Sequence, residues 1–169
     1  MPEIAIIMGS DSDLGVMREA ALTLESFEIK CEVSVLSAHR AHAALQKYVK
    51  AAVKRGVKVF IAGAGGAAHL PGVIAAITEL PVIGVPIKSA ALDGLDAILS
   101  IVQMPSGIPV AAVGVNGAKN AALLAVSMLA LRNRKLALKL SNYRKRMRVE
   151  VLKKNDRLHK VGYKKYLKP

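Results

Sequence analysis

The sequence predicts an α/β protein: a flavodoxin-like three-layer sandwich with a central five-stranded parallel sheet, followed by a long C-terminal helix. Short apolar segments alternate with segments of helical length almost without interruption, which is typical of a parallel sheet covered on both faces. Hydrophobic residues make up 53% of the chain and aromatic residues only 4%, which indicates an aliphatic interior. The length of 169 residues suits one domain with a substantial core.

Each element follows from its local pattern. Residues 3–8 are expected to form a buried strand, and 14–27 place Met17, Ala20, Ala21 and Leu24 on one helical face. The second strand and helix are expected at 31–36 and 43–55, and the third at 57–62 and 70–78. Prolines bracket a short fourth strand at 82–85, which a helix at 92–102 follows. Residues 110–115 predict the fifth strand, and 118–131 an apolar helix.

Two features restrict the cellular location. The uncharged stretch 59–78 is broken by glycines, His69 and Pro71, so it predicts a strand, loop and helix and not a membrane span. Cys31 is the one cysteine, which excludes an internal disulfide, and its place in a strand favours a buried small hydrophobe over a nucleophile. With no signal peptide at the start, we expect a cytoplasmic protein without a membrane partner.

The net charge of +13 lies entirely in the C-terminal segment. Residues 1–131 contain 10 Lys and Arg against 10 Asp and Glu, whereas residues 132–169 contain 15 against 2. We therefore expect a catalytic domain at 1–131 and a basic helical extension at 132–169. An apolar stripe along the extension favours packing on its own body or a neighbouring subunit. A nucleic-acid-binding arm is less favoured because the extension lacks glycine-rich stretches and aromatic residues interleaved with the basic ones. The stripe consists of Leu136, Leu140, Tyr143, Met147 and Val151.

The first loop with a chemical signature is 9–13, between the first strand and helix. Backbone N–H groups at such a helix N-terminus form an anion seat. Ser10 and Ser12 can donate hydroxyls to a phosphate, and Asp13 can accept from sugar hydroxyls. Asp11 or Ser12 could simply cap the helix, but capping does not explain the other polar residues. A metal site at Asp11 and Asp13 is disfavoured, because no further carboxylates accompany them.

The second loop, 37–40, follows the second strand at the edge where open parallel sheets bind ligands. It is Ser37-Ala38-His39-Arg40. The serine offers a hydroxyl and the alanine leaves room. Histidine can move a proton near neutral pH, and arginine can fork onto a phosphate.

The third loop is rich in small residues. It reads Gly63-Ala64-Gly65-Gly66-Ala67-Ala68-His69. A dinucleotide fingerprint would belong to the first strand and would need an acid about 20 residues later, where Ile83 stands. We expect instead a loop that lets a flat heterocycle approach the backbone. His69 is either an orienting residue or a core histidine, whereas His42 and His159 are expected at the surface. The proline-marked stretches 84–86 and 103–109 are expected near the site or an interface.

Four segments in order, 8–13, 37–40, 63–72 and 100–105, resemble the N5-carboxyaminoimidazole ribonucleotide mutase family of purine biosynthesis. This enzyme is also described as the catalytic subunit of phosphoribosylaminoimidazole carboxylase. The resemblance covers residues 4 to about 131. It implies a flavodoxin-like subunit, a homo-octamer, no metal or organic cofactor, and a functional link to an ATP-dependent carboxyaminoimidazole ribonucleotide synthetase.

The resemblance also implies roles for individual residues. His39 would be the catalytic acid and base, Ser10 and Asp13 would contact the ribonucleotide, and Arg40 would bind its phosphate. The other expected substrate-binding residues are Gly9, Ser12, Ser37, Ala38, Gly63, Ala64, Gly65, Gly66, His69 and Leu70.

The implied reaction moves a carboxylate from the exocyclic nitrogen to ring carbon 4 of an aminoimidazole ribonucleotide, without ATP. Decarboxylation would be followed by recarboxylation before carbon dioxide escapes. His39 would protonate the nitrogen and later remove the ring-carbon proton. An imidazole with a reference pKa of about 6.5 suits both transfers.

One departure and several alternatives accompany this resemblance. Ala41 and His42 stand where the family usually has threonine and proline, which predicts a changed loop entry with unchanged chemistry. A sister group carboxylates the bare ribotide with free carbon dioxide and typically carries lysine after the histidine, so Arg40 favours the mutase. A response regulator would need an aspartate where Ala62 and Gly63 stand. A non-catalytic nucleotide sensor is the alternative of a different class, and nucleic-acid binding by the extension stays open as an addition.

Overall fold

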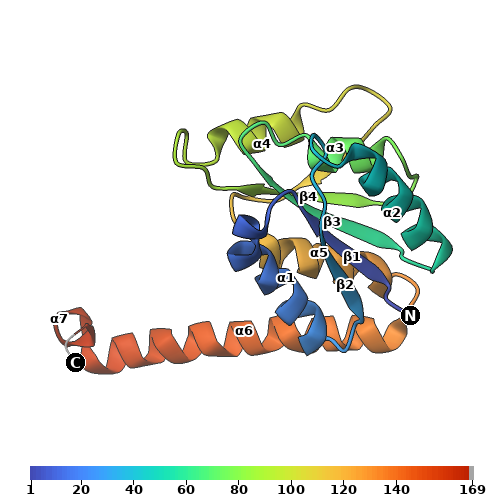
Figure 1. Ribbon diagram of the computed structural model, residues 1–169. Coiled ribbons are helices and arrows are strands. Elements are labelled where there is room, and N and C mark those ends of the chain that lie inside the picture. The colour runs from blue at the N-terminus through green and yellow to red at the C-terminus, as the bar shows by residue number, and fades with distance from the viewer. Residues whose placement is uncertain (168–169) are drawn as a thin grey trace. The chain divides into compact units, whose positions relative to one another are not determined.

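The computed structural model describes residues 1–167 and divides the chain into two compact units. The first comprises Met1–Leu129, and the second begins at Ala130. The first unit holds the five strands and the helices that cover them (Figure 1).

The sheet is parallel throughout and has the order β2-β1-β3-β4-β5. Its strands are β1 (Ile4–Met8), β2 (Cys31–Val35), β3 (Val59–Gly65), β4 (Val82–Ile87) and β5 (Ala111–Ala112). The chain reverses its direction of winding between β1 and β3, and ligands of open sheets bind at such a switch point. The predicted flavodoxin-like, five-stranded parallel sheet is confirmed.

Helices lie on both faces of the sheet (Figure 1). One face is covered by α1 (Leu14–Ser26) and α5 (Ala118–Ala130), and the other by α2 (His42–Lys54), α3 (Leu70–Ala75) and α4 (Leu95–Val102). A short 3-10 turn, η1 (Asp11–Asp13), precedes α1. Right-handed crossovers between parallel strands require this alternation of strand and helix.

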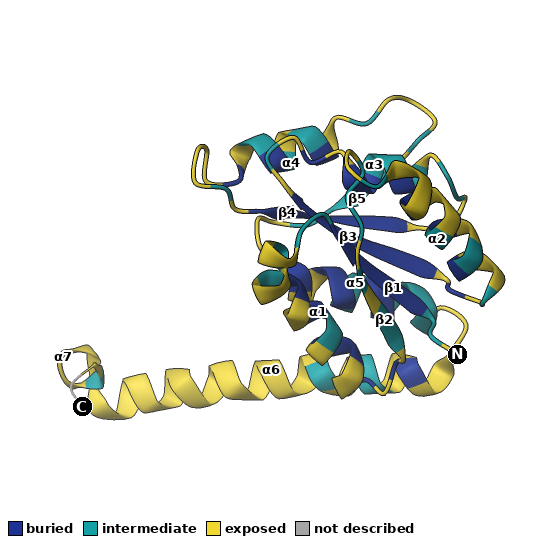
Figure 2. Ribbon diagram, viewed as in Figure 1, coloured by how far each residue is buried: buried dark blue, intermediate teal, exposed yellow. Residues whose placement is uncertain are grey.

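The core occupies both sides of the sheet, and the strands are its most buried elements (Figure 2). Because successive side chains of a strand point to opposite faces, Ile7 and Phe60 pack with α2 and α3, whereas Ile61 and Met8 face the other way. On α2 the buried residues Leu45, Val49 and Ala52 recur at helical spacing, which is why this segment folds as an amphipathic helix.

Two strands differ from the prediction. β3 runs on to Gly65, so Gly63 and Ala64 lie in the sheet and not in a loop. They pair with Val85 and Pro86 of β4, which likewise extends past its proline to Ile87. The proline is tolerated because β5 pairs only with Ile83 and Gly84, and its missing N–H is therefore not needed there. β5 itself covers Ala111–Ala112 and is much shorter than the expected strand at 110–115.

The position of Cys31 on the outermost strand, β2, explains how far this cysteine is buried. Cys31 is half-buried and not fully buried as expected, because an edge strand has a neighbour on one side only. Burial raises the pKa of its thiol, with a smaller contribution from the nearby Glu25 carboxylate. The thiol is therefore a poor nucleophile, as the sequence indicated.

The second unit contains α6 (Arg134–Val161) and the short α7 (Tyr163–Tyr166). The side chain of Asn133 caps α6 by accepting a hydrogen bond from the backbone N–H of Leu136 at 3.0 Å. Met147 and Val151 of the apolar stripe are 49% and 64% exposed. The long C-terminal helix is confirmed. None of the helices in the described part of the chain is long and apolar enough to cross a membrane.

Candidate active site

A cavity of about 460 Å³ opens at the carboxyl ends of β1, β2, β3 and β4. Its volume is typical of small-molecule sites. The residues that line it come from the carboxyl ends of these four strands and the segments that follow them: Gly9, Ser10, Asp13, Ser37, Ala38, His39, Arg40, Ala64, Gly65, Ala67, His69, Leu70, Ile87, Lys88 and Ser89. The cavity therefore brings together most of the residues that the sequence singled out from three separate loops.

A second hollow of about 620 Å³ is larger, but fewer of its lining residues carry charged or titratable side chains. Its described lining includes residues 75–82 and 107–109, among which Glu79 is the charged residue. The stretch 107–109 thus lies at this hollow and not at the histidines, and 84–86 is buried within β4. We assign the site to the smaller cavity because its lining contains histidines that can exchange protons, the Asp13 carboxylate, and the cationic side chains of Arg40 and Lys88.

The first loop is organised by Ser10. Its Oγ accepts a hydrogen bond from the backbone N–H of Ser12 at 3.3 Å, so Ser10 caps η1, and neither Asp11 nor Ser12 does. Asp13 is partly buried, and desolvation raises the pKa of its carboxyl against the lowering effect of hydrogen bonds from Ser10 and Ser12. Ser12 is exposed and does not line the cavity.

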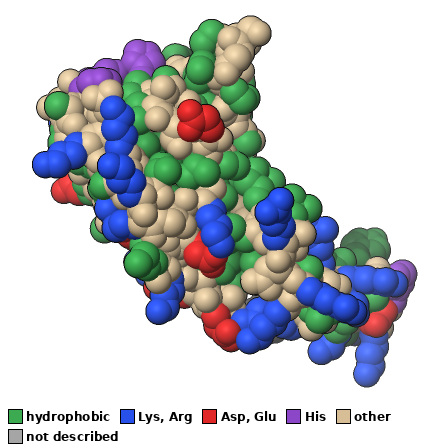
Figure 3. Space-filling view, turned by 90° about the vertical axis from the view of Figure 1, so that its right-hand side faces the viewer, with side chains coloured by type: hydrophobic (Ala, Val, Ile, Leu, Met, Phe, Trp, Pro, Cys, Tyr) green, Lys and Arg blue, Asp and Glu red, His purple; other side chains and the backbone are tan. Residues whose placement is uncertain are grey.

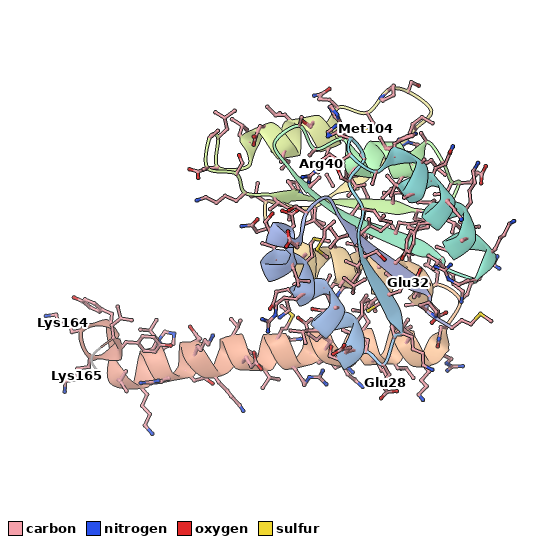
Figure 4. All side chains as sticks on the ribbon, viewed as in Figure 1. Glu28, Glu32, Arg40, Met104, Lys164 and Lys165 are labelled. Atoms are coloured by element: carbon pink, nitrogen blue, oxygen red, sulfur yellow. The ribbon has the colours of Figure 1, made fainter. Side chains whose placement is uncertain are left out.

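Arg40 joins the second loop to the first. Its backbone N–H and its Nε donate to Ser37 Oγ at 3.2 and 3.5 Å, and its Nη2 donates to the Gly9 carbonyl at 3.2 Å. Figure 4 shows Arg40 among the loops at this edge of the sheet. These bonds place the guanidinium beside the expected anion seat. Its remaining N–H groups extend the donor set available to a phosphate.

His39 and His69 form a hydrogen-bonded pair. The distance from His39 Nε2 to His69 Nδ1 is 2.7 Å, and the rings meet edge to face with an interplanar angle of 83°. Both are exposed, and Figure 3 shows histidine side chains gathered on the surface at one end of the first unit. His69 is therefore not a core histidine, and the orienting role is the one its position favours. One ring donates its N–H to the other, so the two imidazoles share a single proton.

The small-residue segment after β3 divides into two groups. Ala64, Gly65 and Ala67 line the cavity, whereas Gly63 and Gly66 do not. A Cβ on Gly63 would lie 2.4 Å from the sulfur of Met17 on α1, so this glycine is required by helix packing. Gly66 adopts φ +60°, a conformation that glycine favours in turns.

Four lining residues were not predicted: Ala67, Ile87, Lys88 and Ser89. The expected end of β4 at residue 85 hid three of them, because Pro86 was taken as the end of the strand. A strand running two residues further carries Lys88 to the same edge as the other loops. The edge position of the loop after the fourth strand is the signal that could have found them.

The entry to α2 reflects the unusual Ala41 and His42. Helix α2 starts at His42, and Ala41 before it provides no side-chain cap. His42 is exposed, as expected. Within residues 1–167 no three His, Cys, Asp or Glu side chains are close enough to hold a metal ion.

Comparisons with known proteins identify the family of this chain. The family model described as AIR carboxylase matches residues 3–150 and so extends into α6. An N5-carboxyaminoimidazole ribonucleotide mutase from Pyrococcus abyssi is 58% identical, covering 99% of this chain and 96% of that protein. A phosphoribosylaminoimidazole carboxylase from Candida glabrata is 52% identical over 98% of this chain, which spans 29% of that longer protein.

A solved structure shows the same architecture. The crystal structure of Treponema denticola PurE has a TM-score of 0.86 and 30% identity, covering 94% of this chain and 99% of that one. The expected resemblance is confirmed by the sequence match and by the shared fold: the chain belongs to the AIR carboxylase family.

Proposed function

We propose that this protein is an N5-carboxyaminoimidazole ribonucleotide mutase, an isomerase of purine biosynthesis that forms 4-carboxy-5-aminoimidazole ribonucleotide. The observation that carries the proposal is the His39–His69 pair, with 2.7 Å between its nitrogens, in the same cavity as Arg40. Support also comes from the 58% identical mutase, of which this chain covers nearly the full length.

The reaction needs one proton to be given and later taken back. As the exocyclic N–C bond breaks and carbon dioxide leaves, the nitrogen receives a proton. The ring carbon then attacks carbon dioxide and loses its own proton, so the sum of protons is unchanged. His39 is the catalytic residue for both transfers.

The histidine pair suits this cycle. A pair that starts with one extra proton can give a proton from His39 while His69 passes its Nδ1 proton to His39 Nε2. Both rings are then neutral, and the return of the ring-carbon proton restores the starting state. The second imidazole therefore supplies the proton that His39 passes on and takes it back when the cycle closes.

The loops orient the ribonucleotide. Gly9, Ser10 and Arg40 bind its phosphate at the anion seat, and Asp13 accepts from ribose hydroxyls. Ala64, Gly65 and Ala67 leave the backbone open to the flat ring. Holding the remote phosphate fixes the ring against His39, so that binding energy is used for orientation.

The organisation around this site follows the family resemblance. Residues 1–131 form the catalytic domain, and the extension 132–169 packs on this body or on a neighbouring subunit of a homo-octamer. The exposed stripe residues Met147 and Val151 support such an oligomer, since apolar side chains on a long helix favour burial. The protein acts in the cytoplasm, and its substrate comes from an ATP-dependent synthetase.

The competing activity is carboxylation of the bare ribotide by free carbon dioxide, which the name of the 52% identical relative also suggests. The test gives the purified protein the N-carboxylated ribotide without bicarbonate and, separately, the bare ribotide with bicarbonate. Product absorbance that rises mainly in the first mixture supports the mutase. Efficient turnover in the second mixture alone would show that the protein is a carboxylase.

A further inference from the structure

A second cation lines the cavity at the end away from Arg40. Lys88 is the first residue after β4, and its side chain is 57% exposed. Among the described lining residues, Arg40 and Lys88 are the two with a permanent positive charge. The carboxylate of that lining, Asp13, comes from the first loop, so Lys88 is the charged side chain that the β4 end contributes to the cavity.

The two cations are separated by the width of the site. The Arg40 guanidinium rests on the Gly9 carbonyl just after β1, and Lys88 leaves the end of β4, with β3 between them. Two strand intervals correspond to roughly 10 Å. A ligand that contacts both cations therefore carries anionic groups at its two ends. His69 follows β3, the strand between β1 and β4, so this histidine, with His39 bonded to it, is placed near the middle of the ligand.

A hydrogen bond fixes the backbone of Lys88, whereas its ammonium group can exchange one ion-pair partner for another. The backbone N–H of Lys88 donates to Asn116 Oδ1 at 2.9 Å, and the backbone N–H of Asn116 donates to the Pro86 carbonyl at 2.8 Å. The ammonium group pairs with Asp93 at 2.9 Å. Asp93 is 79% exposed, and an ion pair between two exposed side chains is weak, so a better-placed anion can replace Asp93.

We propose that Lys88 binds the carboxylate of the ribonucleotide, exchanging its pairing with Asp93 for a charge-assisted hydrogen bond to the ligand. This inference rests on the proposed function, because a ribonucleotide with phosphate at one end and carboxylate at the other is the ligand that satisfies both cations. Lys88 thereby distinguishes carboxylated ribotides from the bare ribotide, which lacks the second anion.

The test measures binding by calorimetry with two probes, 4-carboxy-5-aminoimidazole ribonucleotide and the bare 5-aminoimidazole ribonucleotide. Lys88→Met should weaken binding of the carboxylated probe by about ten-fold or more and change binding of the bare probe by less than about two-fold. Lys88→Arg should retain most of the preference. Lys47→Met, which removes an exposed lysine of α2 outside the cavity, is the control for net charge and should leave both affinities unchanged.

A second variant separates ligand binding from a merely structural ion pair. Asp93→Asn frees the ammonium group, so affinity for the carboxylated probe should stay the same or rise. If Lys88 only held its loop in place through Asp93, Asp93→Asn and Lys88→Met would weaken binding alike, and the inference would be wrong. Equal losses for both probes in Lys88→Met would also overturn it. If the parent protein bound neither probe, the proposed function itself would be refuted, and this inference would fail with it.

Discussion

Replacement of Gly63 by alanine separates two roles for the same residue. The sequence placed Gly63 among the substrate-binding residues, whereas the structure places it in β3 against α1 and outside the cavity lining. The packing role predicts that Gly63→Ala destabilises the fold and leaves the affinity of the folded protein for ribotides unchanged.

The expected size of the effect follows from the geometry. An added Cβ would lie 2.4 Å from Met17 Sδ and 2.9 Å from its Cγ, where ordinary contacts begin at 3.4 Å. Met17 is fully buried, so its side chain must shift by about 1 Å inside a packed core. Overpacking of this kind costs about 1–3 kcal/mol, and the flexibility of methionine favours the middle of that range, about 2 kcal/mol.

The assay is urea unfolding at one fixed protein concentration, since oligomer stability depends on concentration. Met17→Ala alone should cost about 2–5 kcal/mol through the cavity that it leaves. Adding Gly63→Ala to that variant should cost almost nothing, because the new methyl group then enters free space, which gives a coupling of about 2 kcal/mol. Gly15→Ala on α1, where an added Cβ has nothing within 4 Å, is the control and should not destabilise.

The reasoning would be refuted by a Gly63→Ala protein as stable as its parent with a KM raised ten-fold or more. That outcome would show that Gly63 contributes to substrate binding, as the sequence predicted. Additive losses in the double variant would likewise show that the two side chains do not interact.

Three further predictions concern the site and the pH dependence. His39→Asn should lower kcat by about 10²- to 10⁴-fold in the mutase assay and keep affinity for the bare ribotide; near-normal turnover would remove His39 from the mechanism. Asp13→Asn should weaken ribotide binding by calorimetry and raise the free energy of unfolding at pH 7. Burial raises the pKa of Asp13, so its ionised form destabilises the fold, and this gain should vanish below the unfolded pKa of 3.8. Burial likewise raises the pKa of Tyr48 to about 12 from 10.0, which favours the neutral phenol that donates to Glu32. The stability of the parent relative to Tyr48→Phe, measured by urea unfolding, should be constant below pH 10 and fall as the pH rises toward 12.

The alternation of strands and helices was readable because each buried strand is an apolar run and each covering helix repeats every three to four residues. The end of β3 was not readable. Gly63, Ala64 and Gly65 have turn-like composition, and only pairing with Val85, Pro86 and Ile87 makes them a strand. The propensity of a short small-residue segment is weak, so a neighbouring strand decides its conformation.

Loop composition indicated three of the four segments that build the cavity. Glycine, serine, histidine and arginine after buried strands were sufficient, because the carboxyl ends of parallel strands converge on one edge. The Lys88 segment escaped notice, since Pro86 looked like the end of a strand and the absence of a long fifth strand could not be foreseen.

By itself the sequence determined the fold class, the loops that carry the chemistry, and the place of the excess positive charge on one C-terminal helix, because these depend on local pattern and composition. The tertiary structure decided which atoms meet: the bond between His39 and His69, the contact of Gly63 with Met17, and the positions of Arg40 and Lys88 on opposite sides of one cavity. These contacts join residues far apart in the chain. Their geometry is set by the packing of whole strands and helices, and no local segment encodes it.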